Sequence, residues 1–153
     1  MLGSFYNDYE IQDETLKKQY QEIVKNPLKF AQESYSTTLM GVLLQMKKVF
    51  QITPVALREN NSIKAKKLRN FTLYILVHYT DDMQQIVKQF GISQKELLEI
   101  QKDMTLAAKY KKKIEEFFSY NLQEKLANIY MGLCLRDDIL HTLNSKYTKE
   151  TNE

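Results

Sequence analysis

Glycine and proline are scarce in this chain, and this scarcity constrains its fold more than any other feature of the sequence. Only four glycines and two prolines occur in 153 residues, whereas β-sandwiches and barrels need many tight turns built from these residues. The long segments between them are rich in Leu, Lys, Gln, Glu, Met and Ala, which favour helices. The sequence therefore predicts an all-α fold.

The composition is that of one globular domain in a reducing compartment. Hydrophobic residues make up 43% of the chain and charged residues 27%, a balance typical of soluble proteins. The net charge of +3 excludes a histone-like protein, so any affinity for nucleic acid has to come from clustered basic residues. The single cysteine, the absence of a signal-peptide pattern and the lack of a membrane-spanning apolar run predict an intracellular protein. We expect it in the nucleus of a eukaryote, or otherwise in the cytoplasm.

Apolar residues recur at helical spacing, and caps and prolines divide this pattern into segments. We expect one compact domain of six or seven helices over residues 14–143, preceded by an acidic and aromatic arm (1–13) and followed by a polar tail (144–153). Asn26-Pro27 and Thr53-Pro54 each combine a cap residue with a proline that begins a helix. A helical pattern occurs in the stretches 14–25, from 27 onward, 36–50, 54–59, 63–79, 82–90, 94–104, 106–120 and 122–143.

The segment from Thr80 to Met104 has the order of elements found in a helix-turn-helix. A short helix ends at Gly91, which permits a tight reversal, and Ser93 with Glu96 forms a capping box for the next helix. Such a second helix can enter a major groove of DNA. Helix–glycine–helix corners also occur in many helical bundles. A DNA-binding helix-turn-helix and a purely structural corner are therefore interpretations of about equal weight.

A basic segment directly before this corner favours the DNA-binding interpretation. Between residues 58 and 70, five of the six charged residues are basic, and Glu59 is the exception. A basic loop and helix N-terminus suit phosphate oxygens through charge and backbone N–H groups. The alternative is a solvated, lysine-rich helix face. The residues expected to contact phosphates are Arg58, Lys64, Lys66, Lys67, Arg69 and Asn70.

From about residue 42 to 118 the chain resembles the C-terminal DNA-binding domain of the bacterial replication initiator DnaA. In that family the helix-turn-helix is preceded by four elements in a fixed order. These are a helix with a "V…F.I" ending, a short helix, a basic loop ending in Arg-Gln, and a long helix ending in Leu-Thr. This chain matches the order with Val49, Phe50, Ile52, Arg69, Asn70, Tyr79, Thr80, Ile86, Phe90 and Gly91. The resemblance implies a DnaA-like or Trp-repressor-like helix-turn-helix at the centre of the fold, and double-stranded DNA as a partner.

The segment that would read bases departs from the family pattern. The family has Gly-Arg-Asp-His-Thr-Thr-Val after Phe-Gly, and Lys95, Glu96 and Leu97 occupy the His-Thr-Thr positions here. We therefore expect backbone contacts instead of the family's base recognition, with Ser93, Gln94 and Lys95 at the groove. The chain also has no Walker A glycine loop, so it resembles the DNA-binding domain without the ATPase domain of the initiator.

A second basic stretch, from Lys109 to Lys113, follows the corner. Basic residues around a tyrosine can hold a nucleic-acid backbone, but Glu115 and Glu116 come directly after them. We interpret this stretch as a solvated helix face in preference to a DNA contact.

The sequence offers little for catalysis, metal binding or a cofactor. His78 and His141 lie far apart without metal-ligand spacing, and Cys134 sits among apolar residues as an inert, buried thiol would. Adjacent helical residues point about 100° apart, so the pairs Asp81-Asp82 and Asp137-Asp138 are interpreted as caps and surface residues. We expect no catalytic residue, no metal and no cofactor.

Three aromatic residues of the arm, Phe5, Tyr6 and Tyr9, precede every helical pattern and are predicted to contact a protein partner. The expected function is a non-enzymatic DNA-binding accessory subunit of a larger complex. In size and architecture the chain is similar to small accessory subunits of the ciliate DNA N6-adenine methyltransferase complex. The alternatives are a pure protein-interaction module on a helix-turn-helix fold and a stand-alone DnaA-like regulator of a phage or plasmid.

Overall fold

The computed structural model describes residues 9–152, with only the backbone given for residues 145–152. This part of the chain is all-α, as predicted, and contains ten helices, more than the six or seven expected. It divides into two compact units: residues 9–31 with 121–152, and residues 32–120. The first boundary between the units falls inside a helix, α2 (Pro27–Ser34), and the expectation of a single domain over residues 14–143 stays a prediction.

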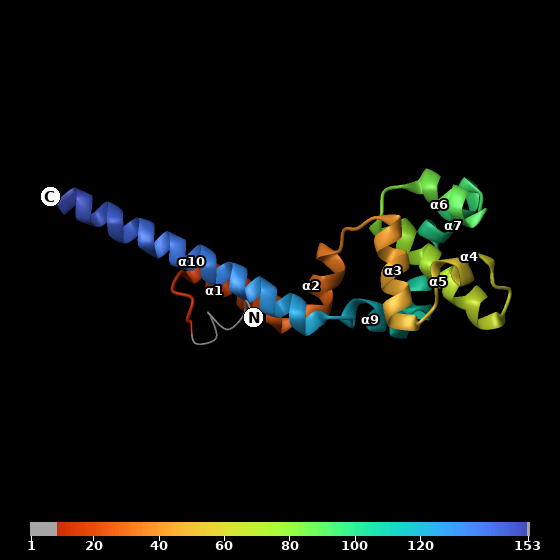
Figure 1. Ribbon diagram of the computed structural model, residues 1–153, viewed down its shortest axis with the longest axis horizontal. Coiled ribbons are helices and arrows are strands. Elements are labelled where there is room, and N and C mark those ends of the chain that lie inside the picture. Colours follow the sequence, from red (N-terminus) through yellow and green to blue (C-terminus); the bar gives the residue numbers. More distant parts are fainter. Residues whose placement is uncertain (1–8, 153) are drawn as a thin grey trace. The chain divides into compact units, whose positions relative to one another are not determined.

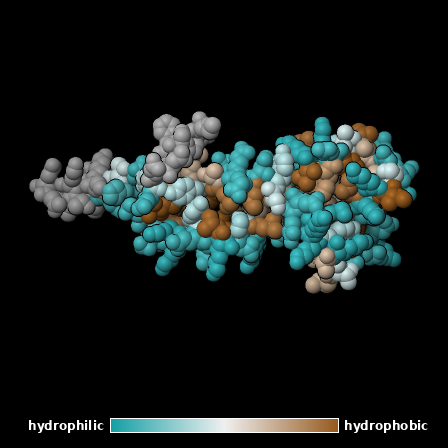
Figure 2. Space-filling model, turned by 90° about the horizontal axis from the view of Figure 1, so that it is seen from below, coloured by the Kyte–Doolittle hydropathy of each residue, from teal (hydrophilic) through white to brown (hydrophobic). Residues whose placement is uncertain are grey.

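The first unit is built from α1 (Glu14–Lys25) and α10 (Leu122–Asn152), which pack against each other (Figure 1). They run antiparallel, because Asp13 at the start of α1 bonds to Asp137 while Tyr20 packs on Tyr130 at 4.8 Å between ring centroids. Their shared core contains Ile11, Leu16, Leu133 and Cys134. On the face drawn in Figure 2, hydrophobic surface gathers in a band along this unit.

Asp137 is the buried anchor of this unit, which corrects the prediction that it is a surface residue. Its side chain is 2% exposed and accepts hydrogen bonds from the Tyr9 hydroxyl (2.7 Å) and from the backbone N–H groups of Gln12 (3.0 Å) and Asp13 (2.7 Å). The Tyr130 hydroxyl also donates to the Tyr9 carbonyl oxygen. Residues 9–13 are therefore fixed onto α10, and Tyr9 contacts its own chain. Phe5 and Tyr6 lie outside the described residues.

The second unit surrounds one central helix, α5 (Ile63–Tyr79). This helix contacts α3 (Leu39–Phe50), α4 (Pro54–Glu59), α6 (Met83–Phe90) and α7 (Gln94–Lys102). Every residue from 71 to 77 is buried, so α5 is enclosed on all sides along this stretch. The unit also contains the end of α2 and two further helices, α8 (Leu106–Lys109) and α9 (Lys111–Ser119).

Aromatic side chains fill much of this second core. The Tyr35 ring lies edge-on to Phe117 and Phe118, both fully buried. Its hydroxyl donates to the Gln45 side-chain oxygen (3.2 Å), and the Gln45 amide donates to the Phe117 carbonyl (2.7 Å), which ties α3 to α9. Burial raises the pKa of Tyr35 to about 12, so this donor keeps its proton at neutral pH. Phe117 and Phe118 thus serve the core and not a partner surface.

Local caps decide where most of these helices begin. Ser62, Asp82 and Ser93 each accept a hydrogen bond from the backbone N–H three residues ahead, as N-cap side chains do. Gly91 adopts the left-handed conformation, with φ 62°, at the predicted end of α6. Thr38 caps α3 in the same way, so that helix begins at Leu39 and not at residue 36.

Three expected helix ends were wrong. The helix starting at Gln94 ends at Lys102, because the Asp103 carboxylate accepts from Thr105, and Met104 beyond it is 89% exposed. The helix expected over residues 106–120 is broken at Tyr110, whose ring is buried against Phe71 at 5.4 Å. The last helix continues to Asn152, through most of the expected polar tail.

Candidate nucleic-acid interface

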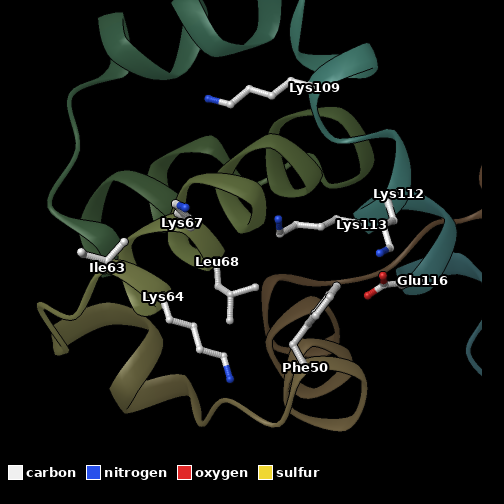
Figure 3. A pocket seen from close by; sticks show the side chains of 9 residues that line it. All are labelled: Phe50, Ile63, Lys64, Lys67, Leu68, Lys109, Lys112, Lys113 and Glu116. Atoms are coloured by element: carbon white, nitrogen blue, oxygen red, sulfur yellow. The ribbon is translucent and has the colours of Figure 1, made fainter.

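Both basic stretches line one groove of the second unit. The groove lies between the end of α3, the start of α5 and the α8–α9 segment, and it encloses about 690 Å³ (Figure 3). We call it the lysine groove. Its nine lining residues are Phe50, Ile63, Lys64, Lys67, Leu68, Lys109, Lys112, Lys113 and Glu116.

Helical geometry and tertiary packing together bring these lysines to one groove. Ser62 begins α5, so Lys64 and Lys67 lie one turn apart on its first two turns. Lys109 ends α8, whereas Lys112 and Lys113 lie on the first turn of α9 beyond the break at Tyr110, so these three reach the groove through the packing of the α8–α9 segment. In Figure 3, the side chains of Lys64, Lys67 and Lys113 surround Leu68. The five lysines give the groove a strongly positive rim, and Glu116, beside Lys112, is its single acidic residue.

The groove also contains apolar surface. Leu68 is buried, Phe50 is half-buried with its ring edge-on to Phe71 (5.7 Å between centroids), and Ile63 is 76% exposed. Lysine side chains can cover such surface with their methylene stems while their ammonium groups reach water. The groove can therefore accept a ligand that is anionic on one side and apolar on another.

The two predicted arginines are engaged within the chain. The Arg69 Nε and Nη2 atoms donate to the carbonyl oxygens of Leu57 and Asn60, each at 2.7 Å, which fastens α4 and the following loop to α5. The Arg58 Nη1 atom donates to the Gln89 side chain on α6, and its Nε atom to the Pro54 carbonyl (3.2 Å). Both arginines therefore stabilise the packing of the chain around α4.

Other predicted residues are separated from the groove. Lys66 is exposed on α5 and does not line it. Gln94 and Lys95 are exposed on the first turn of α7, while Ser93 is used as the cap, where its Oγ atom accepts from the Glu96 N–H (3.1 Å). Leu97, which the resemblance to DnaA led us to expect at a base-reading position, is fully buried. It is therefore closed to DNA and to a partner.

Asn70 lies in a second, acidic hollow of about 400 Å³ between α5, α7 and α8. Glu96, Glu99 and Asp103 line it together with apolar residues such as Ile100 and Tyr110. Hydrogen bonds from the Thr105 side chain and backbone lower the pKa of Asp103, so its carboxylate is charged at neutral pH. We call Glu96, Glu99 and Asp103 the acidic edge of α7.

The stretch from Lys109 to Lys113 was interpreted as a solvated face in preference to a DNA contact. Lys109 and Lys112 are exposed and Lys113 is half-buried, in line with that interpretation, and these three lysines also line the groove. Because the helix is broken at Tyr110 between them, their position beside α5 depends on tertiary packing.

The described residues contain no cluster of three His, Cys, Asp or Glu side chains that would suit a metal ion. None of the described helices combines the length and hydropathy needed to cross a membrane. No family model, curated protein or solved structure matches the chain. The interpretation of the lysine groove therefore depends on its own chemistry.

Proposed function

We propose that this protein is a non-enzymatic DNA-binding accessory subunit that contacts duplex DNA mainly through phosphates. The observation that carries the proposal is the convergence of Lys64 and Lys67 with Lys109, Lys112 and Lys113 on one groove. Lysine ammonium groups are point charges that neutralise phosphates without reading sequence. Because the net charge of the chain is only +3, its affinity for phosphates depends on clustered lysines such as those of the groove.

The corner of α6 and α7 supports a DnaA-like helix-turn-helix within this proposal. A left-handed Gly91 and the Ser93 cap bring α7 back across α6, and Gln94 and Lys95 stand exposed at its start. We place these two residues near the DNA as additional backbone contacts. Since Leu97 is buried, we propose no recognition of the initiator's binding box.

A protein partner is supported by apolar surface on α10. Leu135, Ile139 and Leu143 are spaced four residues apart and are each about half exposed, at 48%, 51% and 57%. Exposed apolar side chains of this kind are typical of protein contacts. We propose a DNA-modifying complex, in line with the resemblance to accessory subunits of DNA N6-adenine methyltransferases, and a nuclear location in a eukaryote.

The dependence of duplex affinity on salt tests the DNA proposal. Each phosphate contact contributes about 0.9 to the slope of log affinity against log salt. We expect Lys67→Gln and Lys113→Gln each to flatten the slope by about one unit and to weaken binding at low salt. Fluorescence anisotropy with a labelled duplex measures both quantities.

Two variants control for overall charge and for folding. Lys66→Gln removes the same charge outside the groove and should change the slope less than Lys67→Gln. Arg69→Lys keeps the charge but cannot reproduce both carbonyl contacts, so it should lower stability by about 1–3 kcal/mol while the slope stays unchanged. Absence of duplex binding by the wild-type protein at low salt would sink the DNA proposal.

The acidic edge of α7 favours a second candidate, a protein-interaction module on the same fold. Glu96, Glu99 and Asp103 would repel a DNA backbone, whereas they suit a basic segment of a protein partner. Under this alternative the Glu96→Gln and Glu99→Gln pair weakens binding to the partner complex. Under the DNA proposal the same pair leaves duplex affinity equal or slightly raised.

A further inference from the structure

The lysine groove has a feature that phosphate contacts do not require. Phe50, Ile63 and Leu68 line it between the lysines, and its volume of about 690 Å³ lies within the usual range of ligand pockets, about 300–1,000 Å³. Ile63 keeps 76% of its surface exposed at the start of α5. A surface that only neutralised phosphates would gain nothing from these apolar side chains.

We propose that the lysine groove binds an unpaired nucleotide of a DNA strand, with its base on the apolar surface and its phosphates on the lysines. This inference rests on the proposed function, and it specifies which form of DNA the groove prefers. An unpaired nucleotide presents an apolar base face beside its negative charge. Proteins that bind single strands combine a basic groove with aromatic side chains on which bases stack. In this groove the Phe50 ring is the aromatic element, and Ile63 and Leu68 extend the apolar surface beside it.

A fully paired duplex can contact the lysines of the groove but not its apolar residues. Its bases are stacked inside the helix, and its outer surface offers phosphates and sugars. Lys64, Lys67 and Lys113 could contact those phosphates, but Ile63 and Phe50 would remain beside water. Unpaired nucleotides cover the apolar residues as well, and so DNA that carries them should bind more tightly than blunt duplex.

The arrangement of charges favours one strand over two. The lysines come from two sides of the groove, Lys64 and Lys67 from α5 and Lys109, Lys112 and Lys113 from the α8–α9 segment, with Leu68 between them (Figure 3). A backbone lying between these sides meets lysines on both. Glu116 stands on the α9 side and opposes this attraction.

The test compares a short blunt duplex with the same duplex carrying a single-stranded thymidine overhang, using the full chain and fluorescence anisotropy. Since stacking of a base on an aromatic ring is worth about 1–3 kcal/mol per base, contact with Phe50 should let the overhang tighten binding about fivefold or more. Ile63→Ser should remove most of this gain. Glu116→Gln should strengthen binding of both DNAs.

Met104→Ser is the matched control, because it removes an apolar side chain that is 89% exposed in the same unit but does not line the groove. It should leave the preference for the overhang unchanged. Circular dichroism spectra that superimpose for wild type and Ile63→Ser would show that the effect is not unfolding.

The outcomes separate the two proposals. Equal affinity for blunt and overhang DNA, or a preference that survives Ile63→Ser, overturns the inference and leaves the DNA-binding function standing. No binding of either DNA at low salt overturns both. Complete displacement of overhang DNA by vesicles containing phosphatidylserine, at matched charge, would show that the apolar residues and lysines serve a lipid surface and would also overturn the inference.

Discussion

Two adjacent carboxylates on α10 have opposite environments. Asp137 is buried beneath residues 9–13 and accepts three hydrogen bonds, whereas Asp138 is exposed. Bonds from the Gln12 N–H, the Tyr9 hydroxyl and the Asp13 N–H lower the pKa of Asp137, although burial opposes them. In turn Asp137 raises the pKa of the Tyr9 phenol well above its usual value, so the hydroxyl remains a donor.

The variant Asp137→Asn should lower the melting temperature of the first unit by several degrees at neutral pH. An amide places an N–H₂ group against one or more of the three donors, which leaves them without an acceptor. Because the pKa of Asp137 is lowered in the folded state, its contribution is fully present above the unfolded value, about 3.9, and is lost as pH falls through the folded value. Thermal unfolding at several pH values measures this.

The expected signature is a difference between wild type and Asp137→Asn that is constant above about pH 5 and shrinks below about pH 4. Asp138→Asn is the control, since it makes the same chemical change one residue further on and should shift the melting temperature little. A difference in melting temperature that persisted unchanged to the lowest pH would contradict the assignment of Asp137 as a charged anchor.

At the scale of the helix, what the sequence could predict depends on how local the cause is. Caps such as Ser62 and Ser93 act within three residues, so the starts of α5 and α7 were predicted correctly. The break at Tyr110 is set by the packing of its ring on Phe71 and Tyr74, far away in the sequence, and no local signal marks it.

The candidate site follows the same division. The basic character of residues 64–67 is visible in the sequence, and so is that of residues 109–113. Their convergence on one groove depends on α9 packing beside α3 and on the enclosure of α5. The engagement of Arg69 by two carbonyl groups likewise depends on the position of α4, and so its structural role was not predictable.

Two glycine-to-alanine variants should change stability in opposite directions. Gly91 has φ +62°, so Gly91→Ala should destabilise the second unit by about 1–2 kcal/mol, although its Cβ would meet no atom within 4 Å. Gly132 lies inside α10 with equally open space. Gly132→Ala should therefore stabilise the first unit by about 0.5–1 kcal/mol. Urea denaturation measures both, and a loss of stability in Gly132→Ala would contradict this explanation.

At the scale of the whole chain, each compact unit has a core of its own. Ile11, Leu16 and Leu133 pack within the first unit. Phe71, Phe117 and Leu97 are fully buried within the second, which also contributes every residue that lines the lysine groove. Stabilisation by a ligand in that groove should therefore be confined to the second unit.

Hydrogen exchange with and without DNA tests this separation. A ligand at 100 times its dissociation constant stabilises the state that binds it by about 2.7 kcal/mol. Amides of α3, α5 and α9 should gain protection of this size when DNA is added, while α1 and the part of α10 near Asp137 should not change. Lys67→Gln is the control, since it should reduce the gain at the same DNA concentration. Equal protection in α10 would mean that the two units unfold together, and would contradict independent cores.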